Sequence, residues 1–327
     1  MARTTTRPLI DAERFDAVEP AWRALFEATP QAHPFSHPAW VHAWTGDAGS
    51  LDTVFLAVRR EERLLGVVPL ELRPGIARIL GDPNVFDYAP VLAVAGEEAI
   101  VARGVLEWMG EDMTPALVAW GLVEGPFLDA FRGATDLGWS TEVQPEAVAP
   151  ALECAEGFEP YVASLGKRER HELRRKMRNF EAAGDVRFEV AGGGDGFATA
   201  LDRLLGLMRA SHPGKVAFLE TYEPFFGPGT TAMANEGLAR ISTLFLAGRP
   251  AGSALTFEHG GCAYLYNSGY DPEFGHLAAG LVSKAWTIRA ALDRGIHRFD
   301  FLRGDEEYKR RLGGVERPIV TATVRQS

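Results

Sequence analysis

Three side chains near the C-terminal end of the chain, Tyr270, Asp300 and Tyr308, are of types that can move protons. Transfer of an acyl group to an amine needs a group that takes a proton from the amine, donors that stabilise the oxyanion, and an acid that protonates the leaving group. Asp300 stands between two phenylalanines at the end of an expected strand, so it is the candidate proton acceptor, with a salt bridge to Arg303 or Lys309 as the alternative. Tyr270 and Tyr308 are the candidate acids, although aromatic residues in strands often serve only packing.

These side chains belong to a stretch whose pattern predicts a strand, a glycine-marked turn, a long helix and a second strand. Alternating residues predict the first strand up to Tyr270, and apolar residues at helical spacing predict a helix from Leu281 to Leu292. A helix that begins at small residues leaves N–H groups open to a diphosphate, and the end of the first strand offers N–H donors for an oxyanion. We therefore expect a segment that binds an acyl donor, with a tight turn as the alternative, formed by Asn267, Ser268, Gly269, Ala278, Ala279, Gly280 and Leu281.

A second charged feature is the segment from Lys167 to Arg178, which holds seven Lys or Arg and two Glu in a chain of net charge -10. Leu173, Met177 and Phe180 recur at i, i+4 and i+7, which predicts one apolar stripe on an otherwise basic helix. The basic face is either simply solvated or an anion site for the phosphates of coenzyme A, an anionic acceptor or a tRNA.

The two halves of the chain have a similar predicted plan. A hairpin with its turn at 60–63 in the first half has a counterpart with its turn at 248–250 in the second, and each leads toward an Asp and Tyr pair. With 327 residues, 46% of them hydrophobic, the chain is long enough for two ordinary domains. We expect domains at 1–148 and 149–327, joined near Pro145–Pro150, while the loops at 211–215 and 222–231 are candidate substrate lids or plain surface connections.

Other chemistries receive little support. The two cysteines, Cys154 and Cys262, are far apart and fit buried thiols, and prolines interrupt any shared helical face for His33, His37 and His42, so no metal is expected. His276 fits a helix cap better than a base. No run approaches the roughly 18 apolar residues of a membrane span, so we expect a cytoplasmic protein without a membrane partner.

Several motifs taken together resemble the GNAT acyltransferase superfamily in its FemAB-like branch, which includes acetyltransferases linked to cellulose and exopolysaccharide biosynthesis. The C-terminal signature is Phe299-Asp300-Phe301-Leu302-Arg303-Gly304 followed by Tyr308-Lys309, and the N-terminal opening is His33-Pro-Phe-Ser-His-Pro-Ala-Trp40. Gly81 to Tyr88 resembles the first-domain loop of that branch, and the basic helix agrees with it too. The resemblance covers roughly residues 30 to 315.

This resemblance implies tandem GNAT-like α/β domains with mixed, mostly antiparallel sheets flanked by helices. It implies an N-acyltransferase that moves an acyl group, acetyl by default, from acyl-CoA to an amine of a small molecule, sugar or peptide, with the donor in the C-terminal domain and the acceptor in the cleft between domains. The implied substrate-binding residues are Trp40, Asp87, Tyr88, Arg303 and Lys309.

Two alternatives stay open. The segment from His276 to Leu281 has one glycine where the widespread GNAT pattern has a Gln or Arg and two small residues, so an aminoacyl-tRNA donor, as in Fem-type enzymes, is the second hypothesis. A non-catalytic binding protein with the same fold is the third, because fold alone does not establish activity. The acceptor, the acyl chain length and the oligomeric state are left open by the sequence.

Overall fold

The computed structural model describes residues 8–46, 52–111, 114–154 and 157–327. The chain divides into two compact units, one formed by Met1–Ala147 with Pro318–Ser327 and the other by Val148–Arg317. We had expected the second domain to run to Ser327. The last strand instead returns to the sheet of the first unit, a long-range pairing that no local pattern in the sequence indicates.

The first unit is a mixed sheet with helices. Its elements are β1 (Leu9–Glu13), α1 (Phe15–Glu27), η1 (Pro34–Ser36), α2 (Pro38–Thr45), β2 (Thr53–Arg60), β3 (Arg63–Arg73), β4 (Ile76–Ile79), β5 (Leu92–Ala93), α3 (Glu98–Glu111), β6 (Ala116–Val123), α4 (Pro126–Arg132), η2 (Ala134–Leu137), β7 (Trp139–Val148) and β14 (Pro318–Gln326). Within the described residues the strand order is β1-β2-β3-β4-β6-β14-β7, with β5 on β3, and the β4–β6 pair is parallel. The predicted first hairpin is confirmed as β2 and β3.

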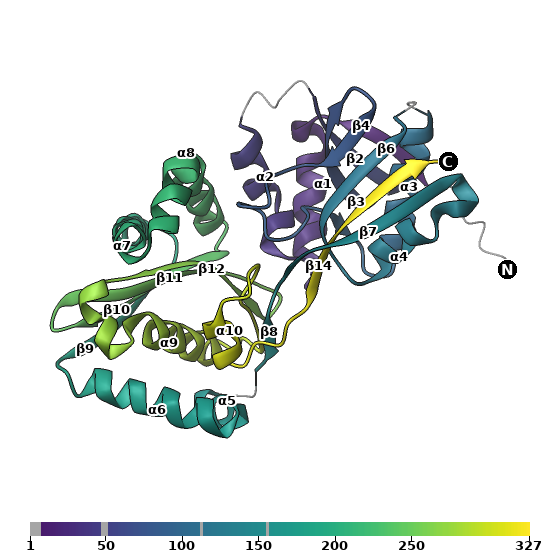
Figure 1. Ribbon diagram of the computed structural model, residues 1–327. Coiled ribbons are helices and arrows are strands. Elements are labelled where there is room, and N and C mark those ends of the chain that lie inside the picture. Colours follow the sequence, from purple (N-terminus) through teal and green to yellow (C-terminus); the bar gives the residue numbers. More distant parts are fainter. Residues whose placement is uncertain (1–7, 47–51, 112–113, 155–156) are drawn as a thin grey trace. The chain divides into compact units, whose positions relative to one another are not determined.

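The second unit carries its own mixed sheet. Its elements are β8 (Ala151–Glu153), α5 (Phe158–Ser164), α6 (Lys167–Glu181), β9 (Val186–Ala191), α7 (Asp195–Ser211), α8 (Pro213–Asn235), β10 (Ala239–Leu246), β11 (Arg249–His259), β12 (Cys262–Tyr270), η3 (Pro272–Leu277), α9 (Ala279–Asp293), β13 (Arg298–Asp300) and α10 (Glu307–Arg311). The order is β8-β13-β12-β11-β10-β9, with β12–β13 parallel and the other pairs antiparallel. Helices α7 and α8 cover one face of this sheet, and α5, α6 and α9 lie on the other (Figure 1). The expected class, mixed and mostly antiparallel sheets flanked by helices, is confirmed.

The basic helix α6 has the predicted amphipathic form. Its buried residues are Leu173, Met177 and Phe180, the three of the predicted stripe. Their burial gives the helix its place in the apolar core beneath α9. The positively charged side chains therefore occupy the remaining faces of the helix.

The predicted loop at 222–231 is wrong, because this segment lies inside helix α8. The helix contains Pro224 and Pro228, residues that usually end a helix since they lack an N–H donor and clash with the preceding turn. Phe226, fully buried, stacks on Tyr266 of β12 with 5.8 Å between ring centroids. Aromatic packing onto the sheet thus outweighs the local preference against helix.

Two glycines allow helices to approach the second sheet closely. A Cβ at Gly252 of β11 would lie 2.8 Å from the Cβ of Ser283 in α9, and a Cβ at Gly269 of β12 would lie 2.4 Å from the backbone of Leu207 and Met208 in α7. Only glycine fits such contacts without a shift of the backbone. Gly252 therefore sets the distance of the α9 N-terminal half from the sheet.

None of the helices in the described part of the chain has the combined length and apolar character of a membrane span. The predicted location in the cytoplasm stays a prediction.

Candidate active site

On the side of β13, strand β12 is paired over only the first part of its length. It pairs with β13 only over Cys262–Tyr264, opposite Arg298–Asp300, where β13 ends. The rest of β12, from Leu265 to Tyr270, has no strand partner on that side in the described residues. An open strand edge presents N–H and C=O groups that an extended ligand with amide groups can pair with.

A bulge interrupts β12 beside this open edge. Leu255 of β11 pairs with Asn267 and Thr256 pairs with Leu265, so Tyr266 is an extra residue with no opposite number in the ladder. A bulge leaves its extra residue unpaired and re-aims the neighbouring groups. A backbone N–H at such a bulge can serve as an oxyanion donor, and this role stays a prediction.

The first turn of α9 follows directly after β12 and η3. Ala278 precedes the helix in the left-handed region at φ 57°, and the N–H groups of Leu281 and Val282 donate to its carbonyl. The N–H groups of Ala279 and Gly280 therefore precede the first helical hydrogen bonds, as expected for an anion site. A Cβ at Gly280 would lie 3.0 Å from Cδ1 of Tyr270, so the tyrosine ring packs against this turn.

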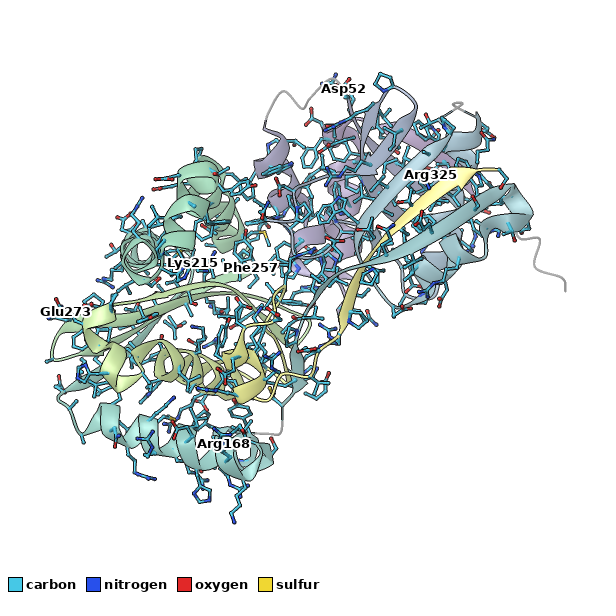
Figure 2. All side chains as sticks on the ribbon, in the orientation of Figure 1. Asp52, Arg168, Lys215, Phe257, Glu273 and Arg325 are labelled. Carbon is cyan, nitrogen blue, oxygen red and sulfur yellow. The ribbon has the colours of Figure 1, made fainter. Side chains whose placement is uncertain are left out.

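Behind the first turn lies a cluster of ammonium groups. Lys284 is 9% exposed, its Nζ donates to the carbonyl of Gly280 at 3.2 Å, and it lies 4.5 Å from the centroid of the Tyr308 ring. Burial lowers the pKa of Lys284 to about 8, and the charges of Lys215 and Lys309 act in the same direction, while Glu306 opposes them. Lys215 of α8 donates to Oδ1 of Asn267 at 2.5 Å, and it lies on the α7–α8 side of the sheet (Figure 2).

Lys309 organises the segment that follows β13. Its side chain is 2% exposed, and Nζ donates to the carbonyls of Leu302, Arg303 and Gly304 and pairs with Glu306 at 2.9 Å. Burial would raise the Glu306 pKa, but the nearby Lys309 ammonium and its hydrogen bond lower it overall. The predicted role of Lys309 in substrate binding stays a prediction, and its contacts within the loop supply a structural reason for its presence.

Asp300 is buried at the end of β13. Its Oδ1 accepts a hydrogen bond from the N–H of Leu302 at 2.8 Å, and its Oδ2 accepts one from Nη2 of Arg317 at 2.6 Å. Asp300 therefore forms a salt bridge with Arg317, a cation that the expected alternative, Arg303 or Lys309, did not name. The bond to Leu302, whose φ is 58°, also holds the bend of the chain after β13. The role of Asp300 as a proton acceptor stays a prediction.

The other predicted residues of the second unit lie on helix α10 and strand β12. Tyr308 lies in the first part of helix α10, with its ring beneath the Lys284 ammonium. Asn267 and Ser268 lie on β12 beyond the bulge, whereas Gly269 serves the close contact with α7 described above. The structure thus brings Tyr270 to the α9 turn and Tyr308 to the lysine cluster, at different ends of the site.

The remaining predicted residues lie in the first unit. Trp40 is fully buried among aromatic rings that include Phe35 and Phe86, and Tyr88 is 5% exposed with its ring against His33. Asp87, which lies between Phe86 and Tyr88 in the sequence, is half-buried. Burial lowers the pKa of His33 to about 4. Their assignment to substrate binding stays a prediction.

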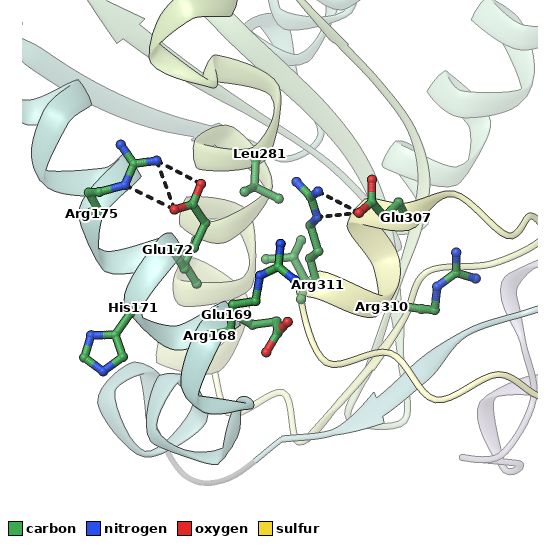
Figure 3. Close-up of a pocket in the computed structure, with 11 residues that line it drawn as sticks. Arg168, Glu169, His171, Glu172, Arg175, Leu281, Glu307, Arg310 and Arg311 are labelled. Atoms are coloured by element: carbon green, nitrogen blue, oxygen red, sulfur yellow. Dashed lines mark hydrogen bonds and ion pairs between the residues drawn. The ribbon is translucent and has the colours of Figure 1, made fainter.

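A basic pocket of about 610 Å³ borders the first turn of α9. Leu281 lines it, together with Arg168 and Arg175 of α6 and Arg310 and Arg311 of α10 (Figure 3). Arg175 pairs with Glu172 and Arg311 with Glu307. Arg168 forms no ion pair within the described part of the chain, and its side chain lies beside that of Arg311 (Figure 3). Arg310 pairs with Glu316, and Glu169 also lines the pocket, so Arg168 is the arginine of this lining that the described carboxylates leave unpaired.

Sequence reasoning missed Lys215 and Lys284. One signal was available for Lys284: a charged residue at a position that helical spacing assigns to the buried, apolar side of the expected helix. Lys215 gives no such signal, because its contact with Asn267 joins residues 52 positions apart. In the described residues, no group of three or more His, Cys, Asp and Glu could hold a metal ion.

One family model matches most of the second unit. Residues 167–310 match the model of the family described as the acetyltransferase (GNAT) domain. The matched residues include α6, β12, α9 and most of α10. A search of curated proteins found no match.

Solved structures share the fold over nearly the whole chain. FemX superimposes with a TM-score of 0.64 at 13% identity, over 96% of each chain. The C-terminal domain of a putative lysylphosphatidylglycerol synthetase from Agrobacterium fabrum gives 0.61 at 9% identity, over 95% of this chain and 92% of that one. A conserved protein of unknown function from Bacteroides thetaiotaomicron VPI-5482 gives 0.64 at 8% identity, over 97% of this chain and 99% of that one. At these identities the likeness concerns the fold alone.

Proposed function

We propose that the chain is an acyltransferase of the FemAB-like branch that moves an acyl group, acetyl by default, from acyl-CoA to an amine of a small molecule, sugar or peptide. The observation that carries this proposal is the first turn of α9 at the end of the open edge of β12. A diphosphate binds the N–H groups of such a turn, and the amide groups of an extended chain pair with such an edge. The match of residues 167–310 to the GNAT domain supports the same assignment.

The residues around the turn suit this donor. Ala278, Ala279 and Gly280 present little side-chain bulk, and the nearby arginine pocket supplies charge for further phosphates. The bulge at Tyr266 lies farther along the same edge, where an acyl carbonyl that develops negative charge would meet a backbone N–H. Direct attack by the amine needs no covalent intermediate with the protein, and no nucleophilic cysteine or serine is assigned to the site.

The second candidate is an aminoacyl-tRNA donor. The charged face of α6 favours it, since Lys167, Arg168, Arg174, Arg175 and Arg178 are all exposed and could contact RNA phosphates. The net charge of -10 opposes non-specific binding of RNA elsewhere on the chain.

A thermal-shift experiment separates the candidates. A ligand that binds only the folded protein raises its melting temperature by mass action, about 2.7 kcal/mol of stabilisation at a hundredfold excess over Kd. We expect CoA and acetyl-CoA to raise the melting temperature and a tRNA to leave it unchanged. Stabilisation by RNA alone would favour the aminoacyl donor, and stabilisation by neither would favour a non-catalytic protein.

A further inference from the structure

Lys284 is a buried cation. Binding of an acyl donor does not by itself explain why a lysine is buried at this position. It is 9% exposed, and its contacts in the structure are the carbonyl of Gly280 and the face of the Tyr308 ring. It forms no ion pair within the described part of the chain. An ammonium group without a carboxylate partner is costly to bury. Its presence at this position therefore calls for a functional reason.

The charges that face Lys284 leave an excess of positive charge. Lys215 of α8 and Lys309 of α10 repel its charge, and Glu306 attracts it. Glu306 forms its ion pair with Lys309. The group thus contains three ammonium groups and one carboxylate. Such an arrangement is complementary to a negative charge that arrives with, or develops on, a substrate.

The position of Lys284 indicates which substrate atom that is. Its Nζ donates to the carbonyl of Gly280 in the turn proposed for the diphosphate, and its charge is repelled by that of Lys215, which donates to Asn267 next to the bulge. Between its diphosphate and its acyl carbonyl, an acyl-CoA carries neutral amides and one sulfur. The sulfur alone gains negative charge as the acyl group leaves.

We propose that the Lys284 ammonium is the acid that protonates the sulfur of the acyl-CoA donor, a role that rests on the proposed function. The amine nitrogen attacks the acyl carbon, the C–N bond forms and the C–S bond breaks with its electron pair on sulfur. Sulfur takes a proton from Lys284, and the proton lost by the amine nitrogen returns to Lys284. Coenzyme A leaves as the thiol, and the lysine ends the cycle protonated.

Two features support this role over that of a passive counter-ion. The lowered pKa of Lys284, about 8, lies near that of an ordinary thiol, about 8.5, so proton transfer between the two is close to balanced. Below pH 8 the group enters the reaction charged. Burial is the main cause of the lowered pKa, and repulsion from Lys215 and Lys309 adds to it. The ring of Tyr308 beneath the ammonium fixes its direction.

The test measures the ionisation of the CoA thiol on the protein. Ultraviolet thiolate absorbance of bound CoA is titrated against pH, with desulfo-CoA as the blank, and CoA affinity is measured by calorimetry for each protein. The variants are Lys284→Met, which keeps the apolar stem without the charge, Lys284→Arg, which keeps the charge but does not release its proton, and Lys215→Met. Lys176→Met, which removes a lysine paired with Glu172 on α6, is the matched control.

In the wild type and in Lys176→Met, bound CoA should ionise at least about tenfold more readily than free CoA, one unit of pKa. Lys284→Met should lose this shift while CoA affinity changes by less than about threefold, and Lys215→Met should lose part of it. Lys284→Arg should keep the lowered pKa of the bound CoA thiol, but it should no longer transfer acetyl from acetyl-CoA to an amine. Equal thiol ionisation in wild type and Lys284→Met, both with CoA bound, overturns the role of Lys284. Failure of the wild type to bind CoA overturns the donor assignment itself, and with it this proposal.

Discussion

The ammonium of Lys284 lies 4.5 Å from the centre of the Tyr308 ring, and these two residues come from different helices, α9 and α10. The ring face attracts the cation, and the carbonyl of Gly280 accepts its hydrogen bond. The pair joins the turn proposed for the donor to the segment after β13. It is the structural link between the two places where tyrosines were predicted to act.

The burial of Lys284 predicts a pH dependence of stability. The folded protein holds the Lys284 proton only up to about pH 8, whereas the unfolded chain holds it up to about pH 10.5. Between these values the unfolded state binds more protons, so the free energy of unfolding rises with pH by roughly 3 kcal/mol from this group.

Denaturant unfolding of wild type and Lys284→Met from pH 7 to 10.5 isolates that contribution. The variant should be more stable than the wild type at pH 7, because it removes a buried charge, and the difference should vanish near pH 10.5. A difference that stays constant across this range would show that Lys284 has an ordinary pKa.

Gly280 is predicted to be required for donor binding. In Gly280→Ala the new Cβ would lie 3.0 Å from the Tyr270 ring, so either the ring or the first turn of α9 must move. We expect CoA affinity to fall about tenfold, or 1.4 kcal/mol, with little change in melting temperature since alanine favours helix. Calorimetry with CoA measures this. Gly275→Ala, whose Cβ would have nothing within 4 Å, is the control and should bind as the wild type does. Equal binding by both variants would place the diphosphate elsewhere.

Asp300 is predicted to stabilise the fold through Arg317 and Leu302. Asp300→Asn keeps an acceptor for the Leu302 N–H but loses the charge that Arg317 contacts, and should lower the free energy of unfolding by about 1–2 kcal/mol. Asp300→Ala loses both bonds and should cost about 3 kcal/mol. A double-mutant cycle with Arg317→Met reports the coupling. A coupling of zero would show that the ion pair with Arg317 contributes nothing to stability.

The arginine pocket is predicted to bind the 3′-phosphate of CoA. Arg168→Ala should lower the affinity for CoA about tenfold and leave that for dephospho-CoA unchanged, since a hydrogen bond to a charged group contributes about 1.5–3 kcal/mol. Calorimetric titration with both ligands measures the difference. Arg178→Ala, an exposed residue of the same helix outside the pocket lining, is the control. Equal losses for both ligands would indicate that Arg168 does not contact that phosphate.

Local patterns in the sequence predicted the elements of the second unit well. The alternation of 262–270, the helix expected from Leu281 to Leu292 and the apolar stripe of α6 all depend on residues close together in the chain. All are present, although α9 begins earlier than expected, at Ala279. Features that depend on contacts between distant parts of the chain were not predicted. The pairing of β14 with β6 and the helical course of α8 depend on partners far away in the sequence.

The candidate site shows the same division. The backbone features, a helix turn of small residues after a strand, follow from sequence. The environment of the side chains does not follow from sequence. Lys309 was expected to bind a substrate, but it is 2% exposed and its ammonium donates to three carbonyls of 302–304. Asp300 forms an ion pair with Arg317, which is 17 residues away in the sequence.

The most direct test of the account is isothermal titration of the purified protein with CoA and with acetyl-CoA. We expect saturable binding at a single site for both ligands, weakened as ionic strength rises because phosphates contribute to it. Absence of binding by either ligand at low salt would contradict the assignment of the α9 turn and the β12 edge to an acyl-CoA donor, and would redirect the search to aminoacyl-tRNA.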